Sequence, residues 1–373
     1  MNNIVKFDYC FGCGVCSAVC PKKIISIRLN KEGFYAPVID KYEDCVYCGA
    51  CLDICAFNHK GLAIETGPLK CWAAWSNDEH VRYDCSSGGA GFEIGKQLIE
   101  QGYKAIGCRY DTKKQRAEHY VATTVNDFIQ SIGSKYIQSF TEEAFKQIDR
   151  KQKYVFFGTP CQVDSLRRMV KKYKCEENFV LVDFFCHCVP SMYLWNAYLK
   201  MQKAITGDVK IARWRNKNKV GWHDSWVMII EGEKGEIRSR MSQGDLFYQL
   251  FLGDVCHGKQ CEKDCKYKYE KSSADIRIGD LWGTTYNNDR HGVSALVAFT
   301  RKGKLIVESL NNITLVEHSF DVVAEGQMKK NVNHKVLSPA IMFMLKHNYS
   351  LTGLTFRVTL FIQKVLTKIY SLL

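Results

Sequence analysis

The chain has 373 residues, 24% of them charged, and a formal net charge of +13, and this length allows two or three domains. No run of 18 or more apolar residues occurs, which excludes a membrane-spanning helix, and the scattered basic residues form no nucleic-acid recognition module. The positive excess suits an acidic protein, a polyanionic coenzyme or an anionic lipid surface as partner.

Two cysteine runs in residues 1–62 share the pattern C-x2-C-x2-C-x3-C, and the second lies 35 residues after the first. In this pattern three thiolates of one run bind one [4Fe-4S] cluster and the fourth crosses to the other. Zinc, which also takes four thiolates, is the disfavoured alternative. The two predicted ligand sets are Cys10, Cys13, Cys16 and Cys55, and Cys20, Cys45, Cys48 and Cys51. Residues 1–62 are therefore predicted to form an α+β, ferredoxin-like two-cluster module.

Clustered cysteines favour metal binding over disulfides, and the first nine residues show no apolar signal segment. We therefore expect a cytoplasmic protein. Within the module, residues 24–40 predict two short strands around a turn at Gly33. A linker at 61–70 follows.

Residues 63–325 alternate between strand and helix signals, which predicts an α/β domain with a mostly parallel or mixed sheet. The predicted helices are 92–101, 142–150 and 162–173, and the predicted strands include 104–110, 154–157, 178–185, 226–232, 273–283 and 294–300.

The first predicted helix of this domain is preceded by Ser86, Ser87, Gly88 and Gly89. Small residues at a helix start let a phosphate reach the backbone amides, although serine–glycine turns are also common caps. Electrons that arrive singly from clusters need a flavin to become a hydride, so this turn is a candidate flavin site. The chain has neither a GxGxxG nor a Walker A motif, so such a site would not be of the Rossmann kind.

Lys135 and Tyr136 stand together in the segment 133–139. They could stabilise an anionic flavin or, in the case of Lys135, donate a proton in catalysis. They could equally be solvated surface residues.

A strand, a turn at Gly158 and a helix start capped by Thr159 are predicted around Cys161. Gly158 and Thr159 are further candidates for cofactor binding. Free amides at the helix start lower a thiol's pKa, which indicates that Cys161 is a reactive thiolate or a metal ligand.

Five more cysteines follow at 186, 188, 256, 261 and 265, and loops at the carboxyl edge of a parallel sheet converge. We predict a third [4Fe-4S] cluster, with zinc as competitor. Its predicted ligands are Cys161, Cys186, Cys261 and Cys265. The buried structural cysteines are predicted to be Cys71, Cys85, Cys108 and Cys175.

Asp280 ends a predicted strand, where an acid binds a ribose or caps a turn. His187 and His223 are candidate proton donors, and a lone histidine is more often structural.

Residues 326–373 form a basic tail with seven Lys or Arg and no Asp or Glu. An amphipathic helix is predicted at 354–373, and it could lie on an anionic membrane, dock on another subunit or pack on its own domain. Its predicted apolar face consists of Phe356, Leu360, Phe361, Val365, Ile369 and Leu373.

The motifs SSGG, GSKYIQS, GTPCQ, CHCVPS and ADIRIGDLWG occur in the order found in the family of coenzyme F420 hydrogenase/dehydrogenase beta subunits, which residues 5–325 resemble. The resemblance implies FAD, a further [4Fe-4S] cluster, and hydride exchange with a deazaflavin or another organic acceptor. Similar chains also occur in bacterial polysaccharide gene clusters. Two departures concern the third cluster: Cys188 replaces a glycine of the family's CHG motif, and the C-x2-C pair has become Cys261-x3-Cys265.

These observations predict an iron–sulfur flavoprotein oxidoreductase that takes electrons from a ferredoxin-like acidic donor and acts on an organic small molecule, with a possible place in polysaccharide biosynthesis. Lys135 and His187 are its candidate catalytic residues. The alternative is an electron-relay subunit of a larger complex without independent turnover. The tail could hold either protein at the inner membrane face or on a partner subunit.

Overall fold

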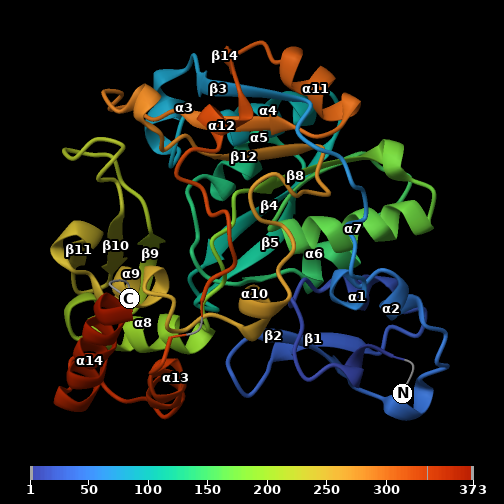
Figure 1. The fold of residues 1–373 in the computed structure, drawn as a ribbon. Coiled ribbons are helices and arrows are strands. Elements are labelled where there is room, and N and C mark those ends of the chain that lie inside the picture. Colours follow the sequence, from blue (N-terminus) through green and yellow to red (C-terminus); the bar gives the residue numbers. More distant parts are fainter. Residues whose placement is uncertain (1–2, 334, 371–373) are drawn as a thin grey trace.

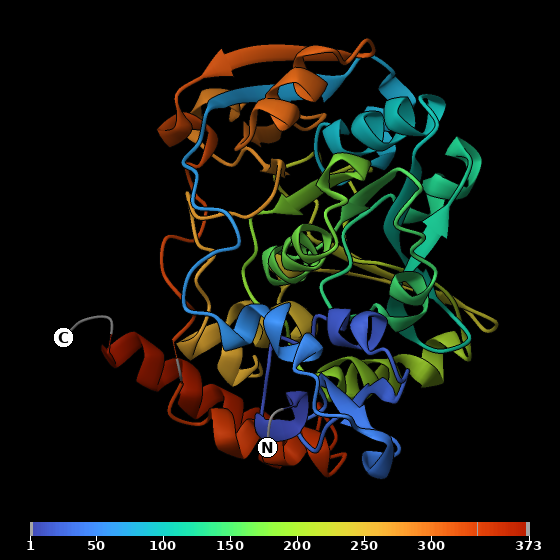
Figure 2. The same cartoon turned by 90° about the vertical axis from the view of Figure 1, so that its right-hand side faces the viewer.

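The computed structural model describes residues 3–333 and 335–370. Within them the chain forms an N-terminal module, a large central sheet covered on both faces, and a lobe that includes the tail (Figure 1). The module and the tail helices lie at the same end of the molecule (Figure 2).

The N-terminal module holds one antiparallel hairpin and two short helices, each following a glycine in the left-handed conformation. These elements are β1 (Ile25–Leu29), β2 (Tyr35–Ile39), α1 (Val15–Val19) and α2 (Ala50–Asp53). The predicted pair of strands around Gly33 is confirmed.

The large sheet of the described residues has nine strands and is mixed. Parallel pairs occupy its centre, whereas β3, β13 and β14 are antiparallel neighbours at one edge, and β4 and β5 form a hairpin at the other. Its strands, in spatial order, are β14 (Ile313–His318), β3 (Lys70–Ser76), β13 (Ser294–Ala298), β12 (Ile276–Asp280), β8 (Phe179–Phe184), β7 (Tyr154–Phe157), β4 (Lys104–Asp111), β5 (Arg116–Ala122) and β6 (Ser139–Phe140).

Alternating side chains of the central strands enter two different cores, as the period of a strand requires. On β7, Val155 packs with α4, α5 and α11, whereas Tyr154 and Phe156 pack with α6, α7 and the module. The helices of this domain are α3 (Glu79–Asp84), α4 (Ala90–Glu100), α5 (Val125–Phe128), α6 (Glu142–Lys146), α7 (Pro160–Lys172), α11 (Arg301–Glu308) and α12 (Phe320–Val323).

The helix predicted at 142–150 is wrong in length, because α6 ends at Lys146. The buried Tyr154 hydroxyl accepts a hydrogen bond from the Asp149 amide at 3.0 Å and donates to the Gln147 carbonyl at 3.4 Å. These bonds hold the backbone in a turn where the helix would have continued.

The remaining lobe combines a three-stranded antiparallel sheet with helices, and its core includes the tail. Phe356 and Leu360 of the last helix are buried in the same core as residues of α8, α9 and α13. The elements are β9 (Val209–Arg213), β10 (Val227–Gly232), β11 (Glu236–Arg240), α8 (Met192–Thr206), α9 (Leu246–Leu252), α10 (Lys259–Lys263), α13 (Ser338–Lys346) and α14 (Leu354–Tyr370).

The predicted single apolar face of the last helix is wrong. Phe356 and Leu360 point into the lobe, whereas Phe361, Val365 and Ile369 are exposed. Residues separated by five positions lie on opposite sides of a helix, so Phe356 and Phe361 cannot share one face. Leu373 lies outside the described residues.

The module is fixed to the sheet domain by buried hydrogen bonds. The Tyr35 amide donates to Gln138 Oε1 and the Ile27 amide to Glu142 Oε2, both at 2.7 Å. Thr141 Oγ1 donates to the Cys13 carbonyl at 2.9 Å, next to Gly14.

Replacing Gly14 with alanine should loosen this junction. The added Cβ would lie 2.1 Å from Thr141 Oγ1, and the Gly14 φ of +79° is unfavourable for any side chain. Strain and crowding together should lower the free energy of unfolding by about 2–4 kcal/mol. Thermal unfolding measures this, with Gly67→Ala as control because nothing lies within 4 Å of its added Cβ. Equal melting temperatures for the two variants would contradict the close approach.

Candidate iron–sulfur centres and cofactor cavity

Each predicted ligand set of the module lines one small hollow. Cys10, Cys13, Cys16 and Cys55 face the first hollow. The second hollow is lined by Cys20, Cys45, Cys48 and Cys51. The fold therefore brings the fourth cysteine of each run to the other run's hollow, as the spacing predicts.

The donor chemistry of these hollows fits bound metal. Burial raises the pKa of the Cys10 and Cys55 thiols to about 12, so they lose their protons only when a cation compensates the charge. Four converging thiols with this requirement suit a [4Fe-4S] cluster.

A third group of thiols lies between the module and the sheet domain. Cys161 is the second residue of α7, whose N-cap Thr159 donates its amide to Gln162 Oε1 at 2.9 Å. Cys186 follows β8, and Cys261 and Cys265 lie on and after α10. These four thiols are close enough to change one another's pKa. Cys186 and Cys261 raise the pKa of Cys161. Cys265 in turn raises the pKa values of Cys186 and Cys261.

The expectation that the helix start lowers the pKa of Cys161 is wrong. Burial outweighs the hydrogen bond with the Thr159 hydroxyl and raises the pKa of Cys161 well above the ordinary value. A neutral buried thiol is a poor nucleophile, so the metal-ligand interpretation is favoured over the reactive thiolate.

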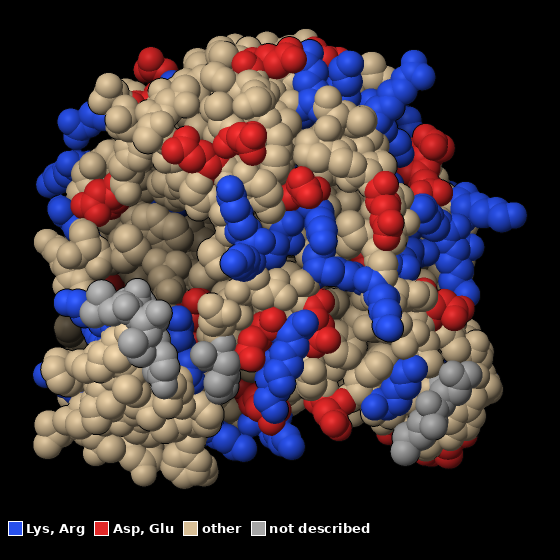
Figure 3. Space-filling model, viewed as in Figure 1, with Lys and Arg blue, Asp and Glu red and all other residues tan. Residues whose placement is uncertain are grey.

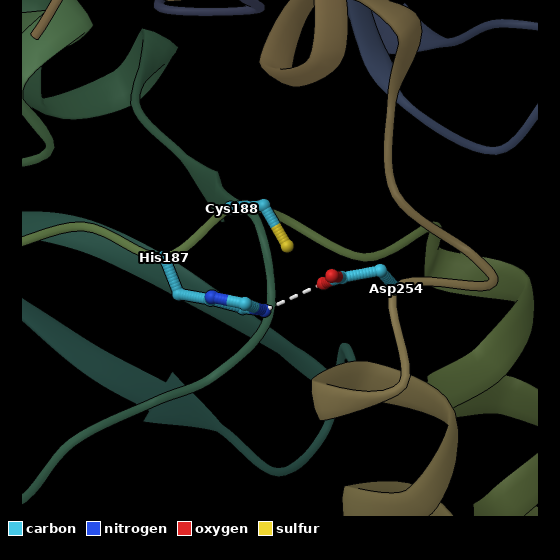
Figure 4. Close-up of side chains that lie close together, drawn as sticks. All are labelled: His187, Cys188 and Asp254. Atoms are coloured by element: carbon cyan, nitrogen blue, oxygen red, sulfur yellow. Dashed lines mark ion pairs between the residues drawn. The ribbon is translucent and has the colours of Figure 1, made fainter. Parts of the chain in front are cut away.

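Cys188 lies beside this third group, next to Cys261 and Cys186. It also belongs to a trio with His187 and Asp254, whose ligand atoms all lie within 4.8 Å of one another (Figure 4). His187 Nε2 and Asp254 form an ion pair at 2.9 Å. The candidate proton donor His187 is thus held by a carboxylate, and Cys188 is a fifth thiol near the third centre.

A cavity of about 590 Å³ extends from the third cysteine group along the ends of the central strands. Its size lies within the range of sites for organic cofactors. A hollow is visible on this face of the molecule in Figure 3. The predicted cofactor and catalytic residues that line it are Ser86, Ser87, Gly89, Lys135, Tyr136, Gly158, Thr159, His187 and Asp280.

Some residues differ from their expected places. Gly88 turns away from the cavity toward β3, where an added Cβ would lie 2.3 Å from the Ala74 carbonyl oxygen. Cys85 and Cys108, predicted as structural, line the cavity. His223 is exposed and contacts the Tyr286 carbonyl, away from the cavity lining.

Buried cations surround the serine–glycine turn, and sequence reasoning missed two of them. Lys217 Nζ donates to the carbonyls of Arg82, Ser87 and His291 at 2.6–2.7 Å. Arg215 donates to the Ser86 carbonyl at 3.3 Å. In the sequence, the available signal for these cations was the pair Arg215-x-Lys217 just after a strand. A positive field at a glycine turn suits a phosphate group.

Asp280 lines the cavity, and two protein side chains hold its carboxylate there. Its carboxylate pairs with Arg215 at 3.2 Å and accepts a hydrogen bond from Trp222 Nε1 at 3.0 Å. Tyr136 also contacts Arg215, and its ring stacks on Trp226 with centroids 4.8 Å apart. Asp280 therefore positions Arg215, and the aromatic pair gives the cavity a flat wall.

One buried polar atom of a residue that lines the cavity fits a bound polar cofactor. His119 Nδ1 has no hydrogen-bond partner among the described residues. Buried polar groups are normally satisfied, so such atoms indicate that a ligand completes the site. A flavin ring offers a donor or an acceptor for this nitrogen.

His119 should also make the fold acid-sensitive. Burial lowers its pKa from 6.5 to about 4, so between these values the unfolded chain binds a proton that the native chain does not. Stability is therefore lost as pH falls below 6.5, by roughly 3 kcal/mol in total. The free energy of unfolding in urea should fall less between pH 7.0 and pH 5.5 for His119→Gln than for the unmodified chain. An equal loss of unfolding free energy in the two proteins would contradict a buried neutral His119.

A two-cluster module docked on a mixed α/β domain with a further cysteine group defines an iron–sulfur redox protein. Residues 9–59 match the 4Fe-4S dicluster domain, and residues 71–146 and 151–319 match the N-terminal and C-terminal parts of the coenzyme F420 hydrogenase/dehydrogenase beta subunit. The chain belongs to this family of beta subunits.

Two curated relatives agree with this assignment. A subunit of the F(420)H(2) dehydrogenase of Methanosarcina mazei is 26% identical over 49% of this chain and 54% of its own length. The beta subunit of the coenzyme F420 hydrogenase of Methanococcus voltae is 24% identical over 58% of this chain and 74% of its own. The chain thus spans about half the length of the first relative.

A solved chain from the F420-reducing [NiFe] hydrogenase complex of Methanosarcina barkeri aligns over 76% of this chain and 89% of its own, with 16% identity and a TM-score of 0.48. Among the described residues, no helix has the length and apolar character to cross a membrane.

Proposed function

We propose that this chain is the iron–sulfur electron-relay subunit of a larger redox complex, without independent turnover. When bound, the clusters would carry single electrons, and FAD in the cavity would exchange them for a hydride with a deazaflavin or a related organic reactant. This is the alternative raised by the sequence, and it is better supported than an independent enzyme because both relatives are named as subunits. Neither relative's name supports a ferredoxin donor or a role in polysaccharide biosynthesis.

The observation that carries the proposal is the row formed by the three cysteine groups. Cys51 of the second hollow is near enough to raise the pKa of Cys16 in the first. Cys13 of the first hollow contacts the Ser165 hydroxyl at 3.2 Å. Ser165 lies four residues after Cys161 on the same face of α7, which is about 6 Å along the helix. Cys161 and Cys186 then line the cavity.

The outer end of this row suits a protein partner. Cys48 is exposed, and its neighbours Val46 and Tyr47 are 57% and 47% exposed. Exposed apolar side chains beside a metal centre are typical of a docking surface for another protein.

Lys268 supports a cluster at the inner end of the row of cysteine groups. It is buried and donates to the carbonyls of Cys186 at 2.7 Å and His187. Its positive charge lies beside the third cysteine group, where a [4Fe-4S] cluster with four thiolates would carry about −2.

The isolated chain, purified without oxygen, should contain about twelve irons, four for each of three clusters. Dithionite should reduce the clusters, as seen by electron paramagnetic resonance. Mixed with coenzyme F420 and either dihydrogen or formate, it should give no sustained F420 reduction. Steady turnover with dihydrogen or formate would overturn the relay assignment. An iron content near eight would contradict the presence of a third cluster.

A further inference from the structure

The last helix, α14, has a second apolar face that nothing in the described structure covers. Its inner face packs Phe356 and Leu360 into the lobe. Six other apolar side chains are between 42% and 80% exposed: Leu354, Val358, Phe361, Ile362, Val365 and Ile369.

These six residues form one stripe. Counted from Leu354, they occur at positions +4, +7, +8, +11 and +15, which at 3.6 residues per turn fall within a sector of roughly 100°. Single exposed apolar residues are ordinary, but a continuous stripe along a whole helix indicates an interaction surface.

Basic residues border this stripe on one side. Arg357, Lys364 and Lys368 fall within a sector of roughly 40° between the exposed stripe and the buried face. No Asp or Glu occurs from residue 326 to residue 373, whereas seven Lys or Arg do. The corner formed by α13 and α14, at the lower left of Figure 3, is mostly uncharged with basic side chains at its margin.

We propose that α14 binds in the plane of an anionic membrane surface, with the stripe in the acyl boundary and the basic row on the lipid headgroups. An apolar stripe flanked by Lys and Arg without acidic residues is the pattern of helices that lie in the interface. Contact surfaces for proteins are instead depleted of lysine, and here two of the three bordering cations are lysines. The inference goes beyond the relay function and does not depend on it.

Vesicle flotation of the full chain tests the proposal. With vesicles of phosphatidylcholine and 30% phosphatidylglycerol the chain should float with the lipid, and with phosphatidylcholine alone at least about tenfold less should bind. Raised salt should weaken the binding, because the basic row acts through screened charges.

Two variants separate the apolar and electrostatic parts. Phe361→Ser with Val365→Ser should abolish flotation with both vesicles, and since both side chains are exposed the fold should persist. Arg357→Gln with Lys364→Gln should remove the preference for anionic lipid. The control is Leu305→Ser on α11, which replaces an exposed apolar side chain outside the stripe. This variant should bind vesicles as the unmodified chain does.

Failure to bind anionic vesicles, or binding unchanged by Phe361→Ser with Val365→Ser, would overturn the proposal. Sedimentation gives an independent readout. If the chain self-associates and the serine variant does not, the stripe is an interface with a second copy of the chain. This result would reject the membrane proposal.

Discussion

Replacing Cys161 with alanine should lower the iron content from about twelve to about eight per chain while the two clusters of the module remain. Cys161 converges with Cys186 and Cys261, so its loss leaves the third cluster with one thiolate fewer, and Cys188 is a further thiol beside this group. Iron analysis and electron paramagnetic resonance of the dithionite-reduced protein measure the result.

The matched control is Cys71→Ala on β3, a buried cysteine that belongs to none of the three groups. Its iron content should equal that of the unmodified chain. Cys188→Ala should also keep about twelve irons. If Cys188→Ala loses four irons and Cys265→Ala loses none, the proposed ligand set is wrong and Cys188 is the fourth ligand.

Replacing Lys135 with methionine should weaken FAD binding by about 10- to 100-fold, the usual value of one charge-assisted interaction. Lys135 lines the cavity, and its ammonium group donates to the carbonyls of Ser131 at 2.9 Å and Ile132 at 3.0 Å. It therefore holds a fixed positive charge at the cavity wall. Equilibrium titration of the flavin-free protein with FAD, followed by flavin fluorescence, measures the loss.

The same residue predicts a pH dependence. Burial lowers the pKa of Lys135 to about 8, so the positive charge is lost as pH rises through this value. FAD affinity of the unmodified chain should fall between pH 7 and pH 9, and that of Lys135→Met should not.

The control for this prediction is Lys266→Met. Lys266 likewise donates to three carbonyls, those of Ala56, His59 and Gly61, but it lies at the module junction and is absent from the cavity lining. It should leave FAD affinity unchanged. Equal affinities of Lys135→Met and Lys266→Met, or the same pH slope in both, would contradict a flavin in this cavity.

The surroundings of the cavity show why sequence reasoning finds some residues near the site and misses others. Ser86 and Tyr136 stand in short motifs whose residue types suggest a role without any partner. Lys217 and Arg215 follow an ordinary strand, and their meaning depends on the carbonyls of Ser86 and Ser87, about 130 positions earlier. For Asp280 the sequence left a ribose contact and a turn cap open, because its partner Arg215 could not be identified from the sequence.

The sequence by itself determined which cysteines of the module face each hollow, because a covalent spacing of two or three residues limits which thiols can reach one centre. It also determined the family and the main strands and helices, since these depend on local periodicity. Only the tertiary structure decided how the three cysteine groups line up, that the surrounding protein raises the pKa of the Cys161 thiol, and that α14 exposes one apolar stripe while burying another. These properties depend on which distant segments exclude water from a side chain, and burial of that kind is set by packing across the whole fold.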